Sequence, residues 1–438
     1  MQGLLSFDQA PPLGVPVRFF LTAPLFGMAG AALLFASGPD LLASRWTVQA
    51  LAFTHLLTAG FMLQIMLGAL QQLFPVVLGA NFSQPERTAG WIHAPVTLGA
   101  IALAGGFLLQ HAWLFALAMV LLGLGILAFL VAAMRALSSV NWRASPMARG
   151  FWIVLAGLLV TVLLGLTLAG ALAQTSTSMP LVLLTQLHVG WGFLVWCSAL
   201  VATVAFTVVP MFLVTPDYPA LLVRFLVPGL FLTVVAWSAA LVWGWPWADP
   251  VLGGLAIVCM VVFCGCTWRL LQQTKRGKRE TLHQFWQLSL LSTLAACALW
   301  LVQSVNETVA HWPPAVFLLA TLVLLGACGS VMMGMLYKIV PFLIWQHLQN
   351  QGKGQVLAPN MKKIIAQTRM DRQIRSLALA LILLLLACIW PTWLVYPAAL
   401  ALFGTQLVLL LNLWHAYTLY KTHLTTIAAA LRGQSAVV

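Results

Sequence analysis

Two histidines of this 438-residue chain lie deep inside apolar runs. His55 opens the stretch HLLTAGFMLQIMLGALQQLFP, and His188 lies within LVLLTQLHVGWGFLVW. Neutral imidazole is a ligand of heme iron and of copper, and an ionisable side chain at such a depth in a membrane marks a functional site by default. We therefore predict His55 and His188 as candidate metal or cofactor ligands. The alternative for each is a buried histidine that is hydrogen-bonded to a neighbouring helix.

The composition predicts the elements that must position these histidines. The chain is 62% hydrophobic and only 7% charged, with a mean hydropathy of +0.99, whereas soluble proteins carry about a quarter charged residues. Apolar runs of about 20 residues are typical of transmembrane helices. We predict an all-α polytopic membrane protein with one transmembrane domain over residues 1–438. Its twelve spans lie near 16–37, 48–78, 91–110, 112–135, 151–173, 181–214, 221–245, 250–271, 284–305, 313–345, 374–394 and 396–419.

The basic residues predict the orientation. If even-numbered spans end on the side of the N-terminus, 19 of the 21 Lys and Arg residues fall on that side. Arg45 lies on the other side, and Lys338 lies inside a span. By the positive-inside rule both termini are cytoplasmic, in a bacterial-type inner membrane. The net charge of +13 then reflects topology within a lipid bilayer, so a nucleic-acid partner is not expected.

The seven remaining histidines are expected near the membrane surfaces, where a histidine is usually solvated. Five of them fall near the cytoplasmic ends of spans and two near the outer ends. They are His93, His283, His347, His415 and His423, and then His111 and His311.

An internal repeat accompanies the first histidine. The pattern G-x7-G-x6-P occurs in the second span and again in the tenth, and the sixth span has a proline at the matching point. The residues are Gly60, Gly68 and Pro75, then Gly326, Gly334 and Pro341, and Pro210. The prolines are 135 and 131 residues apart, or four spans each time, which predicts three pseudo-repeats of about 16–135, 151–271 and 284–419. His55 and His188 precede their prolines by 20 and 22 residues and so share a depth. The tenth span has Leu319 and Thr321 at these positions.

The other polar and sulfur-bearing residues of the spans can be interpreted either as functional or as purely structural. Gln71, Gln72, Tyr337 and Lys338 lie at one depth and could form a polar cluster or a proton path. Lys338 could instead extend to the interface, and the glutamines could bond between helices. The seven cysteines all lie in apolar runs and are expected to be small buried hydrophobic side chains.

The topology resembles that of the catalytic subunit I of the heme–copper oxidase superfamily, which also has a histidine in span two. The local string H-L-x3-G-F-x6-G-x-L-x2-L-F-P is similar to that of small cytochrome-oxidase-subunit-I-like membrane proteins and to the NnrS group, twelve-span heme- and copper-containing proteins. It covers His55, Leu56, Gly60, Phe61, Gly68, Leu70, Leu73, Phe74 and Pro75. The resemblance implies the fold and, at His55 alone, a heme b ligand. If the chain binds heme, we expect His188 to be a second ligand or a second site. Gly60 would let the porphyrin approach the helix.

The chain departs from that superfamily at the histidines of its dioxygen-reducing centre. Span seven contains no histidine, and the body of span ten contains none. We therefore expect electron transfer, or a role in a membrane redox complex with other subunits or a cytochrome, rather than a self-contained oxygen or nitric-oxide reductase. One alternative is a cofactor-free anchor subunit with a docking surface at 346–375. The other is a transporter or handler of copper, heme or a small solute, with methionines such as Met62 and Met332 as ligands.

Overall fold

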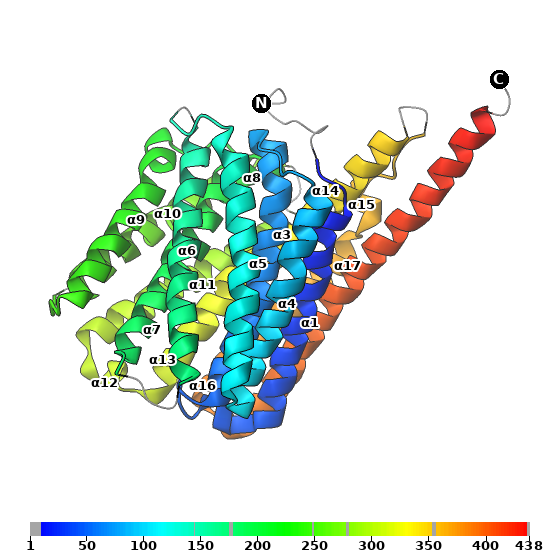
Figure 1. The fold of residues 1–438 in the computed structure, drawn as a ribbon. Helices are drawn as coiled ribbons and strands as arrows, with labels where there is room; N and C mark the ends of the chain where they lie inside the picture. The colour runs from blue at the N-terminus through cyan, green and yellow to red at the C-terminus, as the bar shows by residue number, and fades with distance from the viewer. Residues whose placement is uncertain are drawn as a thin grey trace.

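The computed structural model describes residues 10–143, 145–174, 178–247, 249–276, 280–352 and 356–435, with side chains to residue 431. Every regular element among these residues is helical (Figure 1). The bilayer interior offers no water to backbone N–H and C=O groups, so a chain this apolar must pair them within each segment, as a helix does.

Twelve helical segments of the described residues are long and apolar enough to cross a membrane, as the sequence predicts. In order, they are α1–η3 (Gly14–Ser37, Gly38–Leu42), α2–η4–α3–η5 (Val48–His55, Leu56–Met62, Leu63–Leu73, Phe74–Leu78), α4 (Pro85–Leu109), α5 (Ala112–Ser138), α6 (Pro146–Leu172), α7–η6–α8 (Leu181–Gly190, Trp191–Ser198, Ala199–Leu213), α9 (Ala220–Val242), η7–α10 (Asp249–Gly253, Gly254–Gln272), α11 (Thr281–Val305), α13–η8–α14 (Pro313–Thr321, Leu322–Gly329, Ser330–Gln351), α16 (Gln367–Ile389) and α17 (Pro391–Ser435). Two short helices, α12 (Glu307–Ala310) and α15 (Met361–Ile364), lie between spans.

The boundary between the last two spans differs from the prediction. The sequence predicts a break near residue 395, but α16 ends at Ile389 and α17 begins at Pro391. Proline lacks a backbone N–H and has a helical φ, so it is well suited to the first turn of a helix. The prediction placed Pro391 inside a span and was wrong there.

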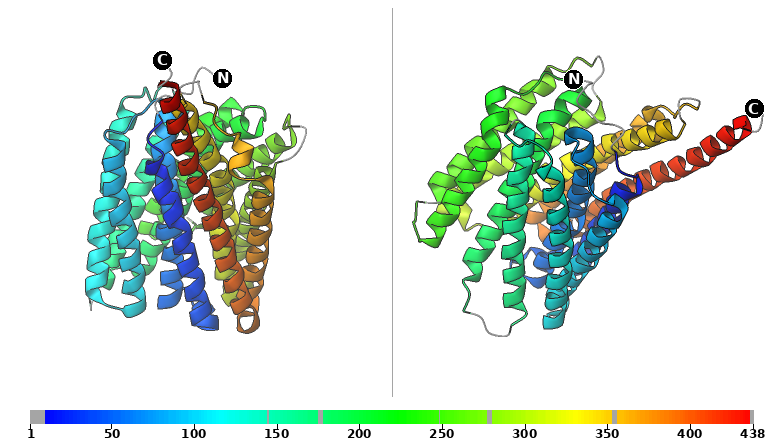
Figure 2. Two further views of the ribbon diagram at one scale, coloured as in Figure 1. Left: turned by 90° about the vertical axis from the view of Figure 1, so that its right-hand side faces the viewer. Right: turned by 45° about the horizontal axis from the view of Figure 1, so that its top comes forward.

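The spans form one bundle in which the first and the last are neighbours. α1 packs along α17, and α1 begins at the same end of the bundle at which α17 ends (Figures 1 and 2). Consecutive spans also pack in pairs, most extensively α4 with α5 and α16 with α17. The C-terminal part of α17 extends beyond the other helices at this end (Figure 1).

Three spans are interrupted by π-helical segments at matching places. These are η4 in the second span, η6 in the sixth and η8 in the tenth. Each begins 19 residues before one of the prolines in the repeat pattern: Leu56 before Pro75, Trp191 before Pro210 and Leu322 before Pro341. A π turn uses an extra residue and changes which face the following residues present, and such turns are frequent at functional sites.

Candidate functional site

The two histidines predicted from the sequence are neighbours in the folded chain. His55 is the last residue of α2, just before η4, and His188 lies in α7, just before η6. Their ring centroids are 6.5 Å apart and their planes differ by 18°. The sequence predicts a shared depth for the pair, and the structure places the two side chains beside each other.

Both imidazoles are held through the same ring nitrogen. His55 Nδ1 lies 2.8 Å from the carbonyl oxygen of Leu51, one turn earlier, and His188 Nδ1 lies 2.9 Å from that of Thr161 on α6. A carbonyl oxygen accepts hydrogen bonds and cannot donate them, so Nδ1 carries the proton in each ring. Neither Nε2 has a hydrogen-bond partner among the described residues. Histidines that bind metals typically have this arrangement, with Nδ1–H fixed and the Nε2 lone pair free.

Apolar groups lie beside both rings, and the two histidines are half-buried. The Phe107 ring of α4 lies 5.0 Å from that of His55. On the other side, a Cβ added to Gly165 of α6 would lie 3.0 Å from His188 Cε1. Glycine at this position therefore allows the His188 ring to lie against the backbone of α6.

The spacing of the rings is compatible with one shared metal. Two imidazoles that bind the same ion at about 2.0 Å from each nitrogen hold their centroids roughly 6 Å apart. No third histidine, cysteine or carboxylate completes a three-residue metal group within the described part of the chain. His55 and His188 would therefore offer two imidazole nitrogens to a bound metal ion or to a heme iron.

Gly60 makes a close approach to a helix. A Cβ at Gly60 would lie 2.5 Å from ring atoms of Phe26 on α1. The other glycines of the repeat pattern also face side chains, such as Phe19 at Gly68 and Phe285 at Gly334. The sequence left open whether Gly60 admits a helix or a flat ligand, and helix packing accounts for this glycine.

Three of the four residues expected to form a polar cluster have other hydrogen-bond partners. Gln71 Nε2 donates to Leu67 O at 3.1 Å, and Lys338 Nζ donates to Glu280 Oε2 at 2.8 Å. Both side-chain polar atoms of Gln72 are buried without a partner among the described residues. Within that part of the chain, no hydrogen bond joins any two of the four.

Tyr337 belongs instead to a buried network of α14, α16 and α17. Its hydroxyl donates to Gln373 Oε1 at 3.0 Å and accepts from Asn412 Nδ2 at 2.8 Å. Gln373 Nε2 in turn donates to Thr405 Oγ1 at 2.9 Å. The signal for this network was the presence of Gln373 and Asn412 in the last two spans, which the sequence reasoning did not use.

Three of the histidines expected near the cytoplasmic side are not simply solvated. His283 is only 1% exposed, so the prediction of a solvated ring was wrong for it. His93 Nε2 lies 2.8 Å from Thr22 Oγ1, and His347 Nε2 lies 3.0 Å from Pro11 O. These three therefore contribute to packing between segments.

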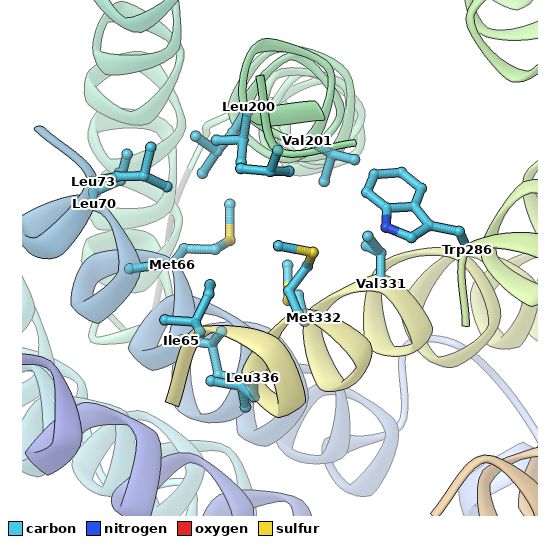
Figure 3. A pocket seen from close by; sticks show the side chains of 15 residues that line it. Ile65, Met66, Leu70, Leu73, Leu200, Val201, Trp286, Val331, Met332 and Leu336 are labelled. Atoms are coloured by element: carbon cyan, nitrogen blue, oxygen red, sulfur yellow. The ribbon is translucent and has the colours of Figure 1, made fainter. Parts of the chain in front are cut away.

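A small apolar cavity lies between the second, sixth and tenth spans (Figure 3). Its volume is about 80 Å³. The three spans contribute the same positions, 10, 9, 6 and 2 residues before their prolines. The residues are Ile65, Leu200 and Val331; Met66, Val201 and Met332; Ala69, Val204 and Met335; and Leu73, Val208 and Ile339. Trp286 of α11 covers one side. The side chains of Met66 and Met332 point into the cavity (Figure 3).

A contact between two cysteines lies one helical turn from this cavity. Cys197 Sγ and Cys328 Sγ are 3.2 Å apart, and both thiols are free and buried. The expectation of buried cysteines is confirmed for Cys197, Cys264, Cys328 and Cys388, whereas Cys259, Cys266 and Cys297 are partly exposed. The sequence reasoning missed the contact, although each of the two cysteines precedes its proline by 13 residues.

Comparison with known proteins leaves the site to be interpreted from its own geometry. No family model matches the chain, and no curated protein matches it.

Proposed function

We propose that this chain is a redox subunit of a bacterial-type inner membrane, in which His55 and His188 would hold a b-type heme, each through its Nε2 atom. The observation that carries the proposal is the neighbouring pair of imidazoles, each fixed through Nδ1 and each with a free Nε2. A heme bound there supplies one-electron chemistry at a potential that its ligands and surroundings tune.

The chain contributes ligand orientation and a dry environment. The carbonyl oxygens of Leu51 and Thr161 hold the tautomer in which Nε2 is the free nitrogen. Phe107 packs against His55, and Gly165 gives His188 room against α6. Apolar surroundings of this kind limit solvent access and so influence a redox potential.

The proposed role is electron transfer within a membrane redox complex. Two histidines do not provide the further copper ligands of the oxidase-like centres that the sequence resembles, so oxygen or nitric-oxide reduction by this chain alone is not part of the proposal. A second subunit or a cytochrome would exchange electrons with it.

We also infer three pseudo-repeats of four spans, with both termini in the cytoplasm. The repeat is supported by the matching starts of η4, η6 and η8 and by the matching positions that line the central cavity. The orientation rests on the basic residues on one side. Reporter fusions after Gln110 and after Ser139 test it, because the first should report the periplasm and the second the cytoplasm.

An optical redox spectrum of the purified protein tests the heme. We expect a reduced-minus-oxidised spectrum of the b type and a heme content that falls strongly in His55→Ala and in His188→Ala. His111→Ala is the matched control, because His111 is exposed at the outer end of a span, and it should keep the wild-type spectrum. Wild-type protein that contains no heme after expression with heme supplied would overturn the proposal.

A second candidate function is the handling of copper. The cysteine and methionine side chains that lie between spans two, six and ten favour it. The third candidate is a cofactor-free anchor, for which the purified protein would show neither a heme spectrum nor bound metal.

A further inference from the structure

The contact between Cys197 and Cys328 is a feature that the proposed heme does not use. Cys197 lies in η6 and Cys328 in η8, on spans six and ten, and their sulfur atoms are 3.2 Å apart. Their exposed fractions are 1% and 7%. Two thiols form only a weak hydrogen bond, so this contact adds little to the stability of the bundle.

A third sulfur-bearing residue occupies the matching place in span two. Met62 precedes Pro75 by 13 residues, as Cys197 precedes Pro210 and Cys328 precedes Pro341. Each of the three is the seventh residue of its π-helical segment, and η4 is in contact with η8. Met62 is 4% exposed. One position of the three spans thus carries two thiols and one thioether.

The next turn adds two more thioethers around open space. Met66 and Met332 follow Met62 and Cys328 by four residues, and their side chains point into the central cavity (Figure 3). A cavity of about 80 Å³ beside the thiols gives these side chains room to rearrange around an ion. The cavity is lined by apolar side chains, so it offers no competing oxygen ligands.

These donors select one class of metal. Thiolate and thioether sulfur are soft ligands that favour Cu(I), whereas Mg²⁺, Ca²⁺ and Mn²⁺ favour carboxylate and water oxygen. Charge gives a second reason. When Cu(I) binds, one cysteine loses its proton to the solvent and forms a Cu–S bond, and the single negative charge cancels the single positive charge. A neutral site is far less costly in a membrane interior than a net charge.

We propose that Met62, Cys197 and Cys328 form a buried Cu(I) site on the axis of the three matching spans, with Met66 and Met332 as further thioether donors. The site is separate from the histidine pair. Met62 follows His55 by seven residues and Cys197 follows His188 by nine, or roughly 10–14 Å along a helix that rises 1.5 Å per residue.

Anaerobic Cu(I) titration of the full-length protein in detergent tests the site. The protein is reduced with a phosphine, and acetonitrile-stabilised Cu(I) is added in competition with bicinchoninate. We expect one Cu(I) per chain, with sulfur as the only neighbour in X-ray absorption. Cys197→Ala and Cys328→Ala should each weaken binding at least about tenfold, and Met62→Leu, which keeps the volume and removes the sulfur, should weaken it measurably.

Matched variants distinguish the loss of this Cu(I) site from other causes of weakened copper binding. Cys264→Ala removes a different buried thiol and should bind Cu(I) as the wild type does. His55→Ala should also retain the ion, while the three sulfur variants should retain any heme spectrum. Because Met62→Leu preserves side-chain volume, a loss of binding in a variant that elutes as the wild-type protein does reports the loss of the sulfur ligand.

Three results would overturn the proposal. The first is wild-type protein that yields all its copper to the competitor. The second is equal loss of copper in Cys264→Ala or His55→Ala. The third is a Cys197–Cys328 disulfide that mass spectrometry detects in anaerobically purified protein and whose reduction creates no Cu(I) binding.

Discussion

The imidazole rings of His55 and His188 lie 6.5 Å apart with planes within 18°, although 133 residues separate them along the chain. Each ring is fixed through Nδ1 to a backbone carbonyl. The position of each Nε2 therefore depends on how the helices pack. A variant that displaces one ring without removing it tests the pair more sharply than a deletion does.

Gly165→Ala is such a variant. Its Cβ would lie 3.0 Å from His188 Cε1, so the ring must move by a few tenths of an ångström. Alanine also favours a helix over glycine by about 0.8–1.0 kcal/mol, which offsets part of the packing cost. We expect little change in thermal stability together with a shifted or weakened heme spectrum.

Gly229→Ala is the control for this prediction, because a Cβ added there would have no atom within 4 Å. It should keep the spectrum and gain a little stability. A Gly165→Ala protein with the wild-type spectrum and heme content would argue against His188 as a ligand.

Gly60→Ala distinguishes a helix contact from a porphyrin contact. The added Cβ would lie 2.5 Å from Phe26 Cγ and 2.7 Å from Phe26 Cβ, and the latter cannot move without its backbone. Overpacking of this kind costs about 1–3 kcal/mol. We expect a lower free energy of unfolding, measured by SDS titration, and the double variant Gly60→Ala/Phe26→Ala should show a favourable coupling. A loss of heme at unchanged stability would point instead to a ligand at Gly60.

The sequence predicted the features that follow from hydrophobicity and spacing. Twelve spans were predictable because each must bury about 20 residues of backbone in lipid. The shared depth of His55 and His188 followed from their distances to Pro75 and Pro210. The contact between the two rings could not be predicted in this way, because a shared depth fixes the position of a residue along its helix and does not fix the direction in which its side chain points.

Interhelical partners were the main part that could not be predicted. Lys338 was expected to extend to the interface, and its partner there, Glu280 at the start of α11, is 58 residues away in the sequence and was not predicted. Cys197 and Cys328 were interpreted as small apolar side chains, since each lies within a long apolar run of the sequence. The π-helical segments were also missed, and they alter the faces that spans two and six present after His55 and His188.

Tyr337→Phe should destabilise the bundle without affecting the histidine pair. The change removes the donor to Gln373 Oε1 and the acceptor of Asn412 Nδ2, and both groups are buried. An unsatisfied buried polar group costs about 1–3 kcal/mol. We expect a loss in this range by SDS titration, with the heme spectrum unchanged. Tyr396→Phe, at a ring that is 41% exposed, should cost much less. Equal costs at the two positions would contradict the role of the network.

Glu280→Gln tests whether the ion pairs at the start of α11 behave as buried pairs. Glu280 binds both Arg276 and Lys338, and the side chains of the Lys338–Glu280 pair are 22% and 17% exposed. Exposed pairs contribute about 0–1 kcal/mol, whereas removing one partner of a buried pair costs about 3–5 kcal/mol. Because the pair is partly buried, we expect a value between these two limits, a loss of about 1–3 kcal/mol in the free energy of unfolding.

A double variant tests where this loss comes from. Because the loss comes mainly from the charge left on Lys338, the double variant Glu280→Gln/Lys338→Met should recover part of it. SDS titration of the wild type, both single variants and the double variant measures this coupling. Additive losses would show that Lys338 is solvated independently of Glu280.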